Sequence, residues 1–178
     1  MSDLARIRRL SRKMEYFTSI LLLATPLLLA FIWLYLDSWS PMLADLPPEA
    51  IRLEALTPWT RLLGFLISMI PAAVMMYGLL QMRALFKQYQ RGQIFTGQAL
   101  LRLRKFAWTL LLSSALKPLI GAVLSVLLSL SNPPGQRMLV LTLSSNDIAM
   151  LFISGVFIVI AWIMAEGVRL ADDNAQIV

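Results

Sequence analysis

The sequence predicts an all-α integral membrane protein with four transmembrane helices. We expect them as two hairpins, with a cytoplasmic helical extension between the second and third spans. Hydrophobic residues make up 58% of the chain and charged residues only 15%, which is outside the range of soluble domains. Four apolar runs are each about 20 residues long, enough to cross a hydrocarbon core of ~30 Å. We interpret residues 1–178 as a single four-span membrane domain.

Polar residues and turn signals set the limits of the four predicted spans. Thr57-Pro58 has the form of an N-cap followed by a proline in the first helical turn. Pro133-Pro134-Gly135 ends the third span, because two prolines and a glycine interrupt a helix. Trp33, Tyr35 and Trp39 are aromatic residues typical of the outer interface of a first span. The predicted spans are 16–36, 61–82, 106–130 and 148–166, the external loops are 37–60 and 131–147, and the cytoplasmic hairpin is 83–105.

Lys and Arg are distributed unevenly around these spans. Five precede the first span, six lie in the central hairpin and one in the tail, whereas the other two loops, taken with their span ends, have only Arg52, Arg61 and Arg137. Basic loops stay on the cytoplasmic side of a membrane. We therefore expect both termini and the hairpin in the cytoplasm, and we attribute the net charge of +6 to this bias rather than to nucleic-acid binding. The first span has no small-x-small cleavage site after it, so we interpret it as a retained anchor.

The residue types argue against an enzyme. The chain has neither Cys nor His, which excludes disulfides, thiolate or imidazole metal sites and histidine acid–base catalysis. The carboxylates fall mostly in loops or at span ends, and no two form a dyad in the bilayer. We predict no catalytic residue, no metal and no cofactor.

A motif in the central hairpin carries a family resemblance. The residues are Leu85-Phe86, Tyr89, Gly92, Ile94-Phe95-Thr96 and Leu103-Arg104-Lys105, with a second marker at Glu166-Gly167-Val168-Arg169-Leu170, Asp172 and Asp173. In these residues the chain resembles the YoaS-like bacterial membrane proteins, catalogued as the domain of unknown function DUF2975. The end 175–178 departs from the family pattern, because it lacks the threonine expected there. The resemblance implies four transmembrane helices and a location in the bacterial cytoplasmic (inner) membrane. It implies no catalytic residues, and genes of this family often neighbour small helix-turn-helix regulators.

Lys117 is the one basic residue deep within a predicted span. It lies about 16 Å from Phe106 along a helix, near the midplane. A charge at this depth is costly and normally faces protein or water, so we expect its ammonium to bond within the bundle. Serines at similar depth give a candidate intramembrane polar site of Lys117, Ser113, Ser68 and Ser154. The alternative is helix packing, with Lys117 bonded to a carbonyl or a buried water; Lys117→Met would then be neutral or stabilising.

The hairpin is the second candidate site. Gly92 is expected to end one helix in the left-handed conformation, and Thr96 to cap the next. The candidate interaction surface consists of Phe86, Tyr89, Arg91, Gly92, Ile94, Phe95 and Thr96. It can dock a cytoplasmic protein or bind anionic lipid headgroups, or the hairpin can be a turn that only sets the topology.

Two functions from different classes follow. The first is a non-enzymatic multi-pass membrane protein that acts through a protein partner or as a regulatory component. The alternative is a small oligomeric transporter or channel subunit that uses the polar site around Lys117. The expected partners are membrane lipids, including anionic headgroups, with a cytoplasmic regulator or a second copy of the chain; we expect no direct nucleic-acid binding.

Overall fold

The computed structural model describes residues 3–36, 56–94, 96–133 and 135–175. This part of the chain forms the helices α1 (Asp3–Leu34), α2 (Pro58–Gln90), α3 (Gly97–Ser129) and α4 (Ser145–Ala175). Each is long and apolar enough to cross a membrane. The prediction of an all-helical chain with four spanning helices is therefore confirmed. The predicted external loop 37–60 lies largely outside the described residues.

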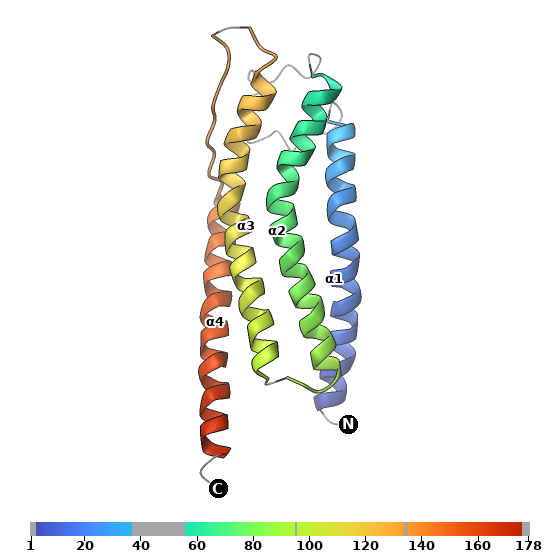
Figure 1. The fold of residues 1–178 in the computed structure, drawn as a ribbon, viewed down its shortest axis with the longest axis vertical. Helices are drawn as coiled ribbons and strands as arrows, with labels where there is room; N and C mark the ends of the chain where they lie inside the picture. The colour runs from blue at the N-terminus through green and yellow to red at the C-terminus, as the bar shows by residue number, and fades with distance from the viewer. Residues whose placement is uncertain (1–2, 37–55, 95, 134, 176–178) are drawn as a thin grey trace.

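The four helices stand side by side in chain order, with neighbours antiparallel (Figure 1). The helix α2 packs against both α1 and α3, and α4 packs against α3. The helices are longer than the predicted spans at the end that holds the N-terminus. The basic N-terminal stretch belongs to α1, and most of residues 83–105 simply continue α2 and α3. We call this end of the molecule, with the start of α1, the α2–α3 turn and the end of α4, the basic end.

Two clusters of buried apolar side chains hold the row of helices together. At the end far from the N-terminus, Trp33 and Leu36 pack with Leu128 of α3. Toward the basic end, Leu85 of α2 packs with Leu103 of α3 and with α4. Because α3 takes part in both clusters, it links the α1 side of the row to α4.

Close contact between α1 and α2 depends on small residues opposite Trp33. The indole lies over Gly64, where an added Cβ would overlap the ring, and Trp33 Nε1 donates to Ser68 Oγ (3.2 Å). Gly64 and Ser68 are one helical turn apart, so they form one slot for the indole. Trp33 is only 3% exposed, so its indole packs between helices rather than against lipid headgroups. Tyr35 is exposed, and Trp39 lies outside the described residues.

The turn between α2 and α3 follows the predicted capping chemistry. Gly92 has φ +82°, its N–H donates to Tyr89, and the next N–H reaches the carbonyl of Gln88 (3.1 Å). This pair of bonds is a Schellman motif. Thr96 accepts from the N–H of Ala99 (3.2 Å) and caps α3. Both capping predictions are confirmed, as is the Thr57 cap of α2.

We expect Gly92→Val to destabilise the protein by about 1–2 kcal/mol, because a β-branched residue is strained at positive φ. The side chain of Arg8 also lies 3.3 Å from where the new Cβ would stand. Thermal unfolding in detergent measures the effect. Gly97→Ala is the matched control in the same turn, since its Cβ would meet no atom within 4 Å. Equal stability of the two variants would contradict a left-handed Gly92.

Candidate functional site

Lys117 of α3 is paired with a carboxylate on α4. Its Nζ lies 2.7 Å from Asp147 Oδ1. The Asp147 residue is only 4% exposed, whereas about half of the Lys117 side chain, 52%, is accessible. The expectation that the ammonium bonds to protein is confirmed. Asp147, which the sequence places in the external loop 131–147, supplies the partner carboxylate.

Asp147 also caps its own helix. Ser144 Oγ accepts from the N–H of Asp147 (3.2 Å), and Asp147 Oδ2 accepts from the N–H of Ser144 (2.9 Å) and lies 2.7 Å from Ser144 Oγ. This reciprocal arrangement is a capping box with aspartate in the third helical position. Both carboxylate oxygens are therefore engaged: Oδ2 starts α4, and Oδ1 joins α4 to α3.

Residues 136–144, which we call the return segment, place Asp147 beside Lys117. The segment has no regular secondary structure, and it runs back beside α3, so that α4 begins partway along its neighbour (Figure 1). Ser129 Oγ accepts from the N–H of Met138 (3.2 Å) and Ser125 Oγ from that of Val140 (2.9 Å). The sequence predicts this segment as part of the external loop 131–147, and the structure places it along α3.

The spacing of these serines matches the extended chain. Four residues advance about 6 Å along α3, and two residues advance about 6.6 Å along an extended strand. The pairs Ser129 with Met138 and Ser125 with Val140 therefore stay in register, and the same register continued brings residue 144 beside Lys117. We call Lys117, Ser125 and Ser129 the polar face of α3. These side chains bond to the Asp147 carboxylate and to N–H groups of the return segment, which would be costly to leave unpaired in an apolar environment.

The other members of the predicted intramembrane site are not gathered around Lys117. Ser113 Oγ donates to the carbonyl of Pro71 (3.1 Å) and ties α3 to α2. Ser154 Oγ donates to the carbonyl of Met150 within α4 (2.6 Å). Ser68 accepts from Trp33. Each serine has its own partner, so the four residues make separate contacts rather than one cluster.

Part of the predicted interaction surface faces α4. Tyr89, Ile94 and Thr96 line a narrow cleft with Met164 and Val168 of α4. Phe86 is partly buried, Arg91 and Gly92 are exposed, and Phe95 lies outside the described residues. The surface thus divides into residues that contact α4 and an exposed turn at Arg91-Gly92.

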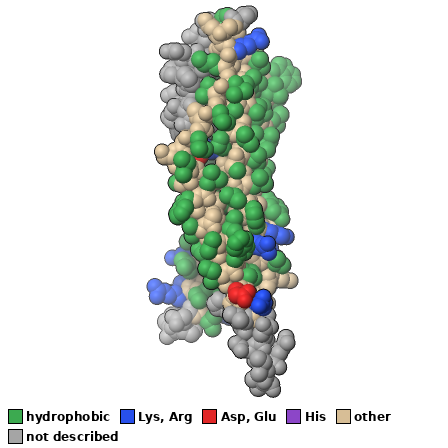
Figure 2. Space-filling model, turned by 90° about the vertical axis from the view of Figure 1, so that its left-hand side faces the viewer, with side chains coloured by type: hydrophobic (Ala, Val, Ile, Leu, Met, Phe, Trp, Pro, Cys, Tyr) green, Lys and Arg blue, Asp and Glu red, His purple; other side chains and the backbone are tan. Residues whose placement is uncertain are grey.

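Positive charge collects at the basic end, where Glu15 and Glu166 are the carboxylates that form ion pairs among the described side chains. The Glu15 carboxylate forms ion pairs with Arg83 (3.9 Å) and Lys87 (3.6 Å) and accepts a hydrogen bond from the side-chain amide of Gln90 (2.7 Å). Glu166 forms an ion pair with Arg169 (3.4 Å). Lys and Arg also appear at the lower end of the α4 side in Figure 2, below a long hydrophobic surface. The basic side chains there that have no ion pair within the described residues are Arg6, Arg8, Arg9, Arg12, Lys13, Arg91, Arg102, Arg104 and Lys105.

One sequence signal for this site was missed. Ser144 and Asp147, three residues apart and followed by an apolar run, have the spacing of a capping box. Reading it would have started α4 at Ser145 and fixed Asp147 in its first turn. Its contact with Lys117 has no local signal, since the two residues are joined through the return segment.

The fold and this site define a class, a multi-pass membrane protein whose third and fourth helices are joined by an ion pair. Over residues 42–178 the chain matches the family described as "Protein of unknown function (DUF2975)", and it belongs to that family. No curated protein and no solved structure matches it.

Proposed function

We propose that the protein is a non-enzymatic component of the bacterial inner membrane, with both termini and the α2–α3 turn in the cytoplasm, and that it acts through a cytoplasmic protein partner. The observation that supports this best is the set of basic side chains at one end that form no ion pair with the described residues. Positive charge marks the cytoplasmic side of membrane proteins. It also attracts partners with complementary acidic surfaces.

The third span supports this threading. With its inner end at Phe106, the helical hairpin 83–105 extends the second and third spans into the cytoplasm, and Lys117 lies about 16 Å into the core, near the midplane. Asp147 of α4 lies at the same depth, because its carboxylate is paired with Lys117. The pairing lowers the cost of a charge at this depth.

The same contacts favour this proposal over a transporter or channel. A polar pathway needs groups that are free to exchange partners with a solute. Lys117 is held by Asp147, and the serines Ser68, Ser113 and Ser154 are each bonded within the protein. The polar residues of the predicted site therefore fit a role in packing.

Photo-crosslinking in living cells tests the proposal, with the probe at Gln93 in the exposed turn or at Gln136 at the opposite end. We expect adducts with a cytoplasmic protein from Gln93 and none from Gln136. Neutralising Arg102, Arg104 and Lys105 to Gln is expected to reduce the Gln93 adduct at least fivefold. Arg137→Gln, a charge removed at the other end, is the control. Cytoplasmic adducts from Gln136 would refute the threading, and adducts with lipid alone from Gln93 would refute the partner.

A further inference from the structure

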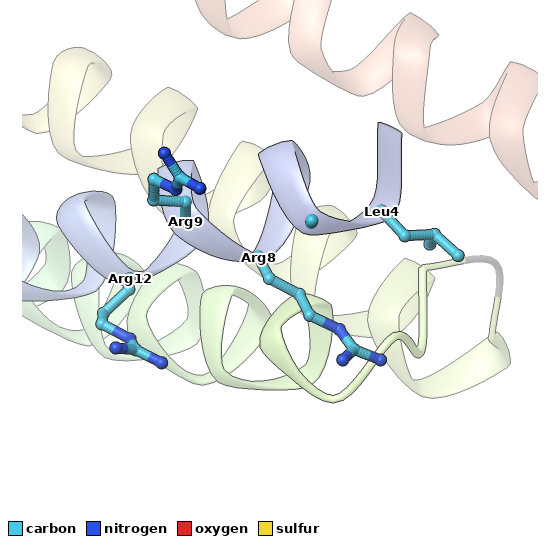
Figure 3. Close-up of a pocket in the computed structure, with 5 residues that line it drawn as sticks. Leu4, Arg8, Arg9 and Arg12 are labelled. Carbon is cyan, nitrogen blue, oxygen red and sulfur yellow. The ribbon is translucent and has the colours of Figure 1, made fainter. Parts of the chain in front are cut away.

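A groove beside the first turns of α1 is lined mainly by arginine. Its volume is about 390 Å³ and its lining residues are Leu4, Ala5, Arg8, Arg9 and Arg12. In Figure 3, Arg8 and Arg12 extend to the same side of α1, and Arg9 extends to another. Sites for small ligands usually occupy about 300–1,000 Å³, so the groove is large enough for a small molecule or a headgroup.

The three guanidinium groups have no counter-charge in the described part of the chain. Arg8, Arg9 and Arg12 are exposed and form no ion pair there. The closest carboxylate along α1 whose side chain is described, Glu15, is already engaged by α2. Like charges three and four residues apart repel one another on a helix, so an anion bound here would relieve that repulsion.

We propose that this groove binds the phosphate group of an anionic ligand. Guanidinium presents paired donors that match phosphate oxygens, and Arg8 and Arg12 lie about 6 Å apart along the helix, close enough for both to reach one phosphate. Leu4 and Ala5 complete the lining of the groove at the end away from the apolar run of α1.

The depth of the groove fits a ligand at the membrane surface. Arg12 lies about 6 Å, and Arg8 about 12 Å, from the start of the apolar run at Tyr16. The headgroup layer is roughly 5–7 Å thick, so the groove extends from that layer into water. A phosphomonoester lipid headgroup and a free phosphate compound both present the required group. This inference does not depend on the proposed protein partner or on which side of the membrane the groove faces.

Calorimetric titration of the purified full-length protein in neutral detergent tests it. One arm uses dioctanoyl phosphatidic acid against dioctanoyl phosphatidylcholine, and the other uses inorganic pyrophosphate. We expect Arg8→Gln/Arg12→Gln to weaken phosphate binding at least tenfold. The matched control Arg102→Gln/Arg104→Gln, which removes two charges outside the groove, is expected to change it less than twofold.

The arms separate the two sources of phosphate. Binding of phosphatidic acid without pyrophosphate assigns a lipid headgroup, and binding of both assigns a soluble phosphate compound as well. Circular dichroism is expected to show unchanged helix content in both variants, because the side chains are exposed. Equal weakening by the two double variants would mean general charge attraction and would overturn the site. So would binding of neither probe, or an affinity for phosphatidylcholine equal to that for phosphatidic acid.

Discussion

Asp147→Ala is expected to destabilise the protein by about 3–4 kcal/mol, the range expected for an unpaired charge within a membrane span together with a lost helix cap. The change leaves the Lys117 ammonium without its carboxylate and also removes the capping box of α4. Thermal and denaturant unfolding in detergent measure the loss of stability. Exchange of the amide hydrogens is expected to rise first at the start of α4.

Two further variants separate the roles of Asp147. Asp147→Asn keeps an oxygen that can accept from Ser144 but removes the charge, so it isolates the ion pair. Ser144→Ala removes only the cap and is expected to cost about 1 kcal/mol. We expect Asp147→Ala to be the most harmful of the three and Ser144→Ala the least. If Asp147→Ala cost no more than Ser144→Ala, the ion pair would contribute nothing to stability.

Gly64→Ala is expected to have the next largest effect, a loss of about 1–3 kcal/mol from overpacking. The added Cβ overlaps the indole of Trp33, which has to move and give up its bond to Ser68. The separation of α1 from α2 would increase as a result. Unfolding in detergent, followed by tryptophan fluorescence, reports both the stability and the displaced ring.

Gly155→Ala is the control for this prediction, because a Cβ at Gly155 meets no atom within 4 Å. It is expected to be neutral or slightly stabilising, since alanine favours a helix over glycine. In a Trp33→Leu background the cost of Gly64→Ala is expected to fall, because the smaller side chain leaves room for the methyl group. An unchanged cost in that background would show that Trp33 does not occupy the slot.

Local chemistry in the sequence predicts much of this fold. The apolar runs predict four spans, and Thr57-Pro58, Gly92 and Thr96 predict where helices begin and end, because each acts on backbone groups within a few residues. The helices of the hairpin 83–105 continue beyond the apolar runs at the basic end, as the helix ends at Gly92 and Thr96 predict. There, charged residues such as Arg83 and Arg104 stay helical outside the apolar runs.

The contacts that the sequence did not predict join residues far apart in the chain. The burial of Trp33 has no signal in the neighbouring sequence, because the slot that holds its indole is on another helix, at Gly64 and Ser68. The sequence places Asp147 in an external loop. Its position beside Lys117 depends on the return segment, which runs back along α3 and bonds to Ser129 and Ser125. The sequence places Tyr89 and Ile94 on an exposed hairpin, but α4 extends past the hairpin and lines a cleft with them.

The central claim is that the polar face of α3 fixes the return segment and joins α4 through Lys117 and Asp147. A double-mutant cycle with Lys117→Met, Asp147→Asn and the two combined tests it most directly. The pairing reverses the expectation that Lys117→Met alone is neutral. We expect each single change to lower the unfolding free energy, and the double variant to be more stable than the sum of the single effects by at least about 1 kcal/mol. Single effects that add to within about 0.5 kcal/mol would contradict the pairing.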